Sequence, residues 1–182
     1  MTEKVFISIG SNLDPEKNID KVKIHLDSHF EVTYSSIYKT PAEGFSGQDF
    51  LNLVCSFETN FDPLGLRSFL KEIEKKMGRT PSQKGMSSRV IDLDLILYGN
   101  LIEKTDQLDI PSKDIEKYNF VLEPLCELAG DAIHPELKIS FREIKEILTK
   151  KKIDACGIGA LFIYYGPYNA VLISYLEEEL EY

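Results

Sequence analysis

Apolar residues in the N-terminal half of the chain recur with two different periods, which predict strands and helices in turn. Four stretches rich in aliphatic, β-branched and aromatic residues predict β-strands: residues 5–9, 30–38, 50–59 and 89–98. Two stretches with helical spacing predict helices, one over about residues 15–28 and one that opens after Asp62 and ends at Gly78. Each helix starts at an Asp-Pro pair, in which we expect the Asp side chain to cap the helix and the Pro to take its first position.

The predicted order of these elements is β-α-β-β-α-β. This order is typical of an α+β, ferredoxin-like fold, in which an antiparallel sheet has its helices packed on it. With both helices on one face of the sheet, we expect the opposite face to be open to ligands.

The second half of the chain predicts a strand-like segment over residues 101–110, a helix over 120–129 and a helix over 140–148. Ser140 and Glu143 have the spacing of a capping box at the start of the last helix. His134 precedes a proline in a predicted turn, so we interpret it as a structural residue.

Residues 155–176 contain no charged side chain, which formally meets the length of a membrane span. Gly166 and Pro167 interrupt the middle of this segment, and its two halves are strand-like, so a β-hairpin is favoured over a span. A hairpin there would cover a sheet edge or pair with another subunit in a homo-oligomer. We therefore divide the chain into a domain over residues 1–152 and an extension with an acidic tail over 153–182.

The stretch over residues 89–98 is the most informative of the predicted strands. Alternation places Ile91, Leu93, Leu95 and Leu97 on one face and Asp92, Asp94, Ile96 and Tyr98 on the other. The two carboxylates are expected roughly 6–7 Å apart. Their repulsion, about 2.5 kcal/mol, is tolerable if the pair is well solvated or if a cation binds between them. Mg²⁺ suits carboxylate oxygens and fills its remaining positions with water and substrate phosphates.

A basic loop precedes this strand. Residues 78–89 contain Arg79, Lys84 and Arg89 but no acid, within a chain of net charge −9. Cations that bind phosphate oxygens, next to acids that bind Mg²⁺, are the groups that a nucleoside triphosphate requires. The alternative is a solvated strand edge that follows a surface loop.

Composition limits the remaining possibilities. The 182 residues are 43% hydrophobic and 28% charged, as expected of one globular domain. The acidic balance argues against non-specific nucleic-acid binding. The three cysteines fit neither a disulfide framework nor a metal spacing, and no signal-peptide pattern opens the chain, so a cytoplasmic protein is expected.

Asn52 is a second candidate for ligand contact. It shares a predicted strand face with Phe50 and Val54. Its amide is suited to the polar edge of a heterocycle, and a structural Asn at the end of a sheet is an equal alternative.

Several motifs together resemble the 6-hydroxymethyl-7,8-dihydropterin pyrophosphokinase family of folate synthesis, over about residues 4–150. They are Ile7-Ser8-Ile9-Gly10-Ser11-Asn12-Leu13, Tyr38-Lys39-Thr40-Pro41, Asp49-Phe50-Leu51-Asn52, Gly78-Arg79, Arg89-Val90-Ile91-Asp92-Leu93-Asp94, Tyr98-Gly99 and Phe120-Val121-Leu122 with Pro124-Leu125. The resemblance implies an enzyme that transfers pyrophosphate from ATP to the pterin hydroxymethyl group and releases AMP.

The resemblance also implies roles for individual residues. Asp92 and Asp94 would hold two Mg²⁺ ions, with Arg89 and Arg79 as further catalytic residues. The pterin site would consist of Thr40, Pro41, Glu43, Phe50, Asn52 and Phe120, and the ATP site of Glu74, Arg79, Lys84, Arg89, Leu95 and Lys113. Ser112, Lys113, Tyr118 and Met86 depart from the family pattern, and Lys113 and Lys117 are candidates to supply the missing contacts.

Two other functions fit parts of the pattern. A non-catalytic paralogue would bind pterin and nucleotide without turnover, as the departures near Ser112 and Tyr118 suggest. A nucleotidyltransferase also combines Gly-Ser with Asp-x-Asp, but the two motifs normally lie close together. Here about eighty residues separate Ser11 from Asp92.

Overall fold

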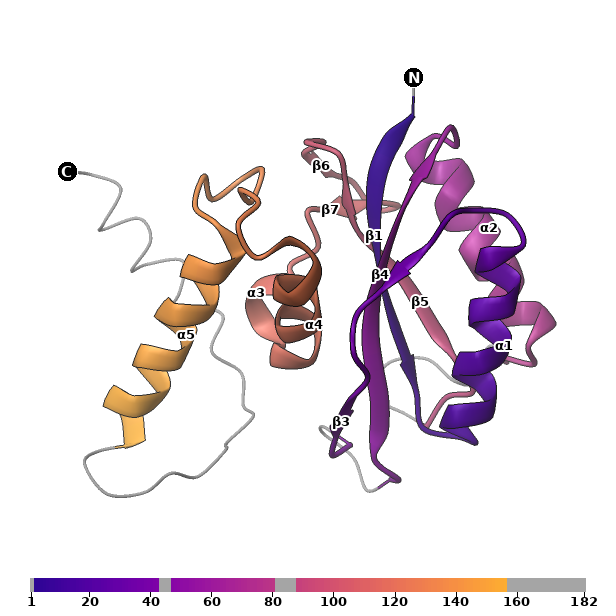
Figure 1. Cartoon of the computed structure of the whole chain (residues 1–182), viewed down its shortest axis with the longest axis horizontal. Helices are drawn as coiled ribbons and strands as arrows, with labels where there is room; N and C mark the ends of the chain where they lie inside the picture. Colours follow the sequence, from indigo (N-terminus) through magenta and orange to yellow (C-terminus); the bar gives the residue numbers. More distant parts are fainter. Residues whose placement is uncertain (1, 43–46, 81–87, 157–182) are drawn as a thin grey trace.

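Figure 1 shows the computed structural model of the chain, which describes residues 2–42, 47–80 and 88–156. These residues form an antiparallel β-sheet with helices, so the predicted α+β class is confirmed. None of the described helices combines the length and the apolar character that crossing a membrane requires. Glu43 and Lys84 lie outside the described residues, as do residues 157–182, which contain most of the predicted hairpin and the acidic tail.

The main sheet has the strand order β2-β4-β1-β5, and β3 also pairs with β4. Its long strands are β1 (Glu3–Ser11), β4 (Phe50–Thr59) and β5 (Asp92–Tyr98), and its short ones are β2 (Thr33–Tyr34) and β3 (Tyr38–Thr40). The strand predicted over residues 30–38 is therefore two strands. Ser35 interrupts it, because its hydroxyl oxygen accepts the Val54 N–H at 3.0 Å in place of a backbone carbonyl.

Two helices, α1 (Pro15–Asp27) and α2 (Pro63–Lys76), cover one face of the sheet (Figure 1). The predicted cap of α2 is confirmed, because Asp62 Oδ1 accepts the Gly65 N–H at 2.7 Å. The predicted cap of α1 is wrong, because the Asp14 side chain makes no capping bond. A capping residue normally has an extended backbone, as Asp62 has, whereas Asp14 is left-handed at φ 44°.

The opposite face of the sheet is not open as predicted. Helices α3 (Asp114–Lys117) and α4 (Asn119–Ala129) lie against it, and α5 (Phe141–Cys156) packs on the outside of α4 (Figure 1). Phe6, Val54 and Ile96 are buried in one cluster with apolar residues of α4 and α5. The sheet thus has an apolar layer on each side, so a ligand cannot extend over the whole of this face.

Helix α5 begins at the predicted capping box but is longer than predicted. The Ser140 hydroxyl accepts the Glu143 N–H at 3.2 Å, and Glu143 Oε2 accepts the Ser140 N–H at 2.7 Å. The helix then continues to Cys156, so the predicted boundary at residues 152 and 153 falls inside it. The strand-like segment predicted over residues 101–110 forms the short strands β6 (Glu103–Lys104) and β7 (Asp109–Ile110), which pair with each other.

Strand β5 starts at Asp92, three residues later than predicted, and contains a bulge. Ile7 pairs with Leu95, but the preceding residue, Phe6, pairs with Leu97, so Ile96 is an extra residue. As a result Leu97 is buried in the cluster with α4, and the prediction that it shares a face with Leu93 is wrong. Because the bulge follows Asp94, both aspartates keep the predicted face.

His134 is fully buried, and its surroundings explain why it is neutral. Nδ1 accepts the backbone N–H groups of Glu136 and Leu137 at 3.2 and 3.1 Å. Nε2 has no hydrogen-bond partner among the described residues, and Glu116 Oε1 lies 3.8 Å away. Burial lowers the pKa of His134 from 6.5 to about 4.

This histidine predicts how stability responds to acid. Between pH 6.5 and 4 the unfolded chain binds a proton at His134 but the folded chain does not. The free energy of unfolding therefore falls by up to about 3 kcal/mol as the pH falls through this range. His134→Gln should flatten that part of the curve of unfolding free energy against pH, measured by denaturant titration. The exposed His25, changed to Gln, is the control and should leave the slope unchanged. Equal slopes for wild type and His134→Gln would contradict the assignment.

Candidate active site

The register of the sheet brings the predicted pterin and metal residues into one row. Gly10 of β1 pairs with Asn52 of β4 on one side and with Asp92 of β5 on the other. In the next row on the same face, Ser8 pairs with Val54 and Asp94. Adjacent strands lie about 4.8 Å apart, so Asn52 and Asp92 are separated by roughly 10 Å of backbone that carries no side chain.

Gly10 is required by the amide beside it. A Cβ atom at Gly10 would lie 2.9 Å from Asn52 Oδ1 and 3.9 Å from the Phe50 ring. Asn52 is held from the other side, because its Nδ2 donates to the Thr40 hydroxyl at 2.8 Å. The Asn52 amide is therefore fixed next to a bare stretch of β1.

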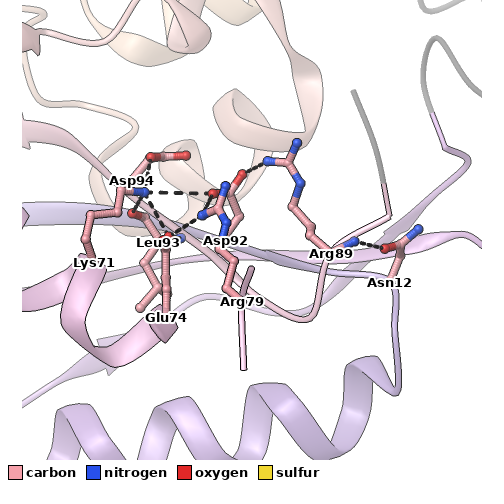
Figure 2. Close-up of polar contacts among 8 residues, drawn as sticks. All are labelled: Asn12, Lys71, Glu74, Arg79, Arg89, Asp92, Leu93 and Asp94. Atoms are coloured by element: carbon pink, nitrogen blue, oxygen red, sulfur yellow. Dashed lines mark hydrogen bonds and ion pairs between the residues drawn. The ribbon is translucent and has the colours of Figure 1, made fainter. Parts of the chain in front are cut away.

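Two of the basic residues predicted to contact phosphate, Arg79 and Arg89, converge on Asp92, as Figure 2 shows. Arg79, just beyond the end of α2, and Arg89, just before β5, each pair with a different oxygen of Asp92. Burial and the neighbouring Arg79 lower the pKa of Arg89, but a guanidinium stays protonated in proteins. Two cations are thus held on the carboxylate before any substrate arrives.

Glu74 and Lys71, one turn apart on α2, attach that helix to the outer edge of β5 (Figure 2). Glu74 is almost fully buried, and its Oε1 accepts the Leu93 N–H at 2.6 Å and pairs with Arg79 at 2.6 Å. Lys71 Nζ donates to the Leu93 carbonyl at 2.9 Å. Since β5 lies at the edge of the sheet that the structure describes, these bonds satisfy backbone groups that no strand of this sheet reaches.

Lys71 also changes the charge balance of the site. Its ammonium lies 3.1 Å from Asp94 Oδ1 and 3.9 Å from Asp92 Oδ1. Three acids and three bases then form one neutral cluster: Glu74, Asp92 and Asp94 with Lys71, Arg79 and Arg89. The chain thus supplies cations of its own to the two aspartates, in addition to the solvent or bound ion expected from the sequence.

The turn after β1 holds the start of the basic segment in place. Asn12 is fully buried, and its Oδ1 accepts the Arg89 N–H at 2.8 Å (Figure 2). Its Nδ2 donates to Gln48 O at 3.1 Å and Ser88 Oγ at 3.2 Å, and the Ser11 hydroxyl donates to Val90 O at 2.5 Å. The sequence analysis included Ser11 and Asn12 in a family motif but assigned them no such contacts, and it missed Lys71; the signal for Lys71 was its spacing of three residues from Glu74.

Phe50 and Phe120, two more of the predicted pterin residues, lie on the same side of the sheet as Asn52. Phe50 precedes Asn52 on β4 and has its ring beside Gly10. Phe120 lies in the first turn of α4, packs against the cluster that contains Val54, and stacks on Tyr118 with ring centroids 4.8 Å apart. Pro41 directly follows β3 and is exposed. A pterin held between Phe50 and Phe120 stays a prediction.

The remaining predicted ATP residues are placed differently. Leu95 packs against the core under α1 and α2, so its side chain is on the face opposite Asp94. Lys113 is exposed at the start of α3, and the preceding Ser112 donates its N–H to Ile96 O at 2.9 Å. That bond holds the segment against β5 two residues beyond Asp94, which is compatible with a role for Lys113 in nucleotide binding.

The site offers two carboxylates for a metal ion. No group of three or more His, Cys, Asp or Glu side chains suited to a metal occurs among residues 2–42, 47–80 and 88–150. Mg²⁺ bound with a nucleotide commonly uses only one or two protein carboxylates, and waters and phosphates complete its shell. Asp92 and Asp94 fit this requirement.

The chain is similar to proteins of one family. The family model for 7,8-dihydro-6-hydroxymethylpterin-pyrophosphokinase (HPPK) matches residues 6–130. The 2-amino-4-hydroxy-6-hydroxymethyldihydropteridine pyrophosphokinase of Haemophilus influenzae is 35% identical over 153 residues, 81% of this chain and 95% of that protein. The protein of the same name from Aquifex aeolicus is 33% identical over 150 residues, with 81% and 93% covered.

Longer proteins are also similar. The chain is 38% identical over 144 residues to folic acid synthesis protein FOL1 of Dictyostelium discoideum, but it spans only 22% of that protein's length. A crystal structure of Plasmodium falciparum HPPK-DHPS with pteroate has the same fold, with a TM-score of 0.64 at 14% identity over 83% of this chain and 43% of that one. On the family model and the bacterial relatives, the chain belongs to the 7,8-dihydro-6-hydroxymethylpterin-pyrophosphokinase family.

Proposed function

We propose that the chain transfers the pyrophosphoryl group of ATP to the hydroxymethyl oxygen of 6-hydroxymethyl-7,8-dihydropterin and releases AMP. The observation that supports this most strongly is the cross-strand row of Asn52, Gly10 and Asp92. In this row the Asn52 amide, which is suited to bind a heterocycle, lies about two strand spacings from the Asp92 carboxylate and the arginines paired with it. We also assign the sheet to the ferredoxin-like class on its strand order.

In this proposal Asp92 and Asp94 hold two Mg²⁺ ions against the triphosphate. When bound, the ions neutralise charge on the phosphates as the β-phosphorus is attacked. Arg79 and Arg89 bind phosphate oxygens, and their contacts with Asp92 keep both guanidinium groups close to where the phosphates bind. The two arginines then need little reorganisation, which is how positioned charges lower a barrier most effectively.

The acceptor is held on the other side of Gly10. The Asn52 amide binds the polar edge of the pterin, and the Thr40 hydroxyl keeps that amide oriented. Phe50 and Phe120 supply aromatic surface for the bicyclic ring. The hydroxymethyl oxygen attacks the β-phosphorus and loses its proton to solvent, the bond from that phosphorus to the oxygen that bridges it to the α-phosphate breaks, and AMP leaves with that oxygen.

One assay separates this function from its alternatives. Purified protein is incubated with ATP, Mg²⁺ and the hydroxymethyl-dihydropterin, and the products are resolved by chromatography. Equal amounts of AMP and pterin diphosphate support the proposal. Pyrophosphate release with nucleotidyl transfer would indicate a nucleotidyltransferase, and pterin binding without ATP consumption would indicate a non-catalytic paralogue.

The cytoplasmic location and the homo-oligomer stay predictions.

The acceptor side of the row has its own test. Gly10→Ala places a methyl group against Asn52 Oδ1. It should raise KM for the pterin about tenfold, because displacement of the Asn52 amide weakens one hydrogen bond to the pterin. KM for ATP should be nearly unchanged. Steady-state kinetics with each substrate varied in turn would show this. In an Asn52→Ala background the same change should have little further effect, because the clashing atom is gone. Fully additive effects would contradict the arrangement.

A further inference from the structure

Lys71 makes several contacts in the site, but the proposed function gives it no role. Its ammonium has three N–H groups, and three oxygens within hydrogen-bond distance accept them: Glu74 Oε1 at 2.8 Å, Leu93 O at 2.9 Å and Asp94 Oδ1 at 3.1 Å. A fourth oxygen, Asp92 Oδ1, lies 3.9 Å away. The ammonium is therefore fully coordinated, at a point between the two aspartates.

Two of these contacts keep Lys71 in place whatever happens at Asp94. Glu74 is buried, and the Leu93 carbonyl belongs to the backbone of β5, so neither acceptor can move far from the ammonium. Breaking these bonds would leave the outer edge of β5 unsatisfied at Leu93, at a cost comparable to that of a lost buried hydrogen bond. The positive charge of Lys71 is thus held beside the carboxylate pair.

Asp92 and Asp94 differ in how their charge is compensated. Asp92 pairs with both Arg79 and Arg89 and is largely buried, with a side chain 17% exposed. Asp94 has a side chain 49% exposed and pairs with Lys71. The oxygen that Lys71 occupies, Asp94 Oδ1, thus belongs to the carboxylate of the pair that is more open to solvent and to an incoming ion.

We propose that Lys71 is a built-in counter-ion that competes with the divalent metal for Asp94 and so sets the Mg²⁺ concentration that the enzyme requires. The proposal rests on the function given above, in which Asp92 and Asp94 bind the metal. Lys71 is a positioning residue in this account: it aligns β5 through Leu93 and lowers the metal affinity of Asp94 by its charge.

The direction of the effect follows from Coulomb's law. A divalent ion at Asp94 either displaces the ammonium from Oδ1 or shares the carboxylate with it, and in both cases it meets a like charge that Glu74 and Leu93 keep close. Near contact distance in a solvated site, such repulsion corresponds to about a tenfold change in affinity. Removal of the charge should therefore tighten metal binding, although it also removes an anchor of the site.

The test is a binding measurement with three variants. Mn²⁺ is titrated into protein saturated with a non-hydrolysable ATP analogue, and free Mn²⁺ is followed by electron paramagnetic resonance. Lys71→Met keeps the unbranched stem without the charge and should lower the Mn²⁺ Kd about tenfold. Lys71→Arg keeps the charge and should stay within about twofold of wild type. Lys76→Met is the matched control, because Lys76 pairs with Glu72 on the exposed side of the same helix.

A second readout is the Mg²⁺ concentration at half-maximal activity, which should fall for Lys71→Met and stay constant for Lys76→Met. If Lys71→Met fails to fold, as judged by circular dichroism, Lys71→Gln keeps an N–H donor for the Leu93 carbonyl and replaces it. Unchanged or weaker Mn²⁺ binding by the uncharged variant would overturn the inference and leave the proposed function standing. A wild type that binds no Mn²⁺ with the nucleotide would overturn both.

Discussion

Asp94→Asn is expected to lower kcat at least about a thousandfold while the protein remains folded. A neutral amide is a much poorer Mg²⁺ ligand than a carboxylate, and the loss corresponds to about 4 kcal/mol of transition-state stabilisation, within what a catalytic metal supplies. The fold should tolerate the change, because the Asp94 side chain is half exposed and its ion pair among the described residues is with Lys71, which keeps Glu74 and Leu93 O as partners.

The measurement is single-turnover formation of AMP at saturating ATP and Mg²⁺, with circular dichroism to check the fold. Asp106→Asn is a suitable control, since Asp106 is exposed between β6 and β7 and is not one of the charged residues of the site. It should keep wild-type turnover. A folded Asp94→Asn protein that turns over at the wild-type rate would refute the metal role of this carboxylate.

Glu74→Gln is expected to have the largest effect on stability, because the Glu74 carboxylate compensates two cations at once. Its Oε1 pairs with Lys71 at 2.8 Å and with Arg79 at 2.6 Å in an almost fully buried position. The amide keeps an oxygen for the Leu93 N–H but leaves both cations without this partner. Breaking a buried ion pair from one side costs about 3 kcal/mol.

The same change should lower kcat about a hundredfold, because Leu93 lies between Asp92 and Asp94 and a displacement of β5 moves both carboxylates. Urea unfolding gives the stability, and steady-state kinetics below the transition gives the rate. Glu72→Gln on the exposed side of α2 is the matched control, with little change expected in either quantity. A Glu74→Gln protein as stable as wild type would show that the buried contacts are not what holds α2 to β5.

The alternation of apolar and polar residues predicted the site face of the sheet correctly as far as the bulge at Ile96, and beyond it Leu97 and Tyr98 lie on the faces opposite to those predicted. It placed Phe50 with Asn52, and Asp92 with Asp94, because side-chain direction in a strand depends only on local backbone geometry. The register of β1 then adds what the alternation alone lacks. It shows that Gly10 separates the two pairs and that no Cβ atom fits there beside Asn52.

Features that depend on distant contacts were not predictable in the same way. The bulge at Ile96 follows from how β5 registers against β1, and the cover of α4 over Val54 and Phe6 follows from packing between segments far apart in sequence. The two Asp-Pro pairs look alike in sequence, yet Asp14 is left-handed and only Asp62 caps its helix.

The charge of the site was the least predictable property. Asp-x-Asp next to a basic loop indicated phosphate and metal chemistry, but Lys71 comes from a helix predicted only as an amphipathic element. Its ammonium reaches Asp94 because α2 packs along the edge of β5, where Leu93 leaves backbone groups for Glu74 and Lys71 to bind. The packing of α2 along β5 decides whether Asp92 and Asp94 face solvent or a lysine, and the spacing of residues in the sequence does not predict that packing.

The most direct test of the central claim is a crystal structure of the protein with Mg²⁺, a non-hydrolysable ATP analogue and 6-hydroxymethylpterin. The account predicts Mg²⁺ bound by oxygens of Asp92 and Asp94 and by the triphosphate, with the pterin on the far side of Gly10 against the Asn52 amide. Carboxylates that point away from the triphosphate with no ion between them, or a pterin bound elsewhere, would contradict it.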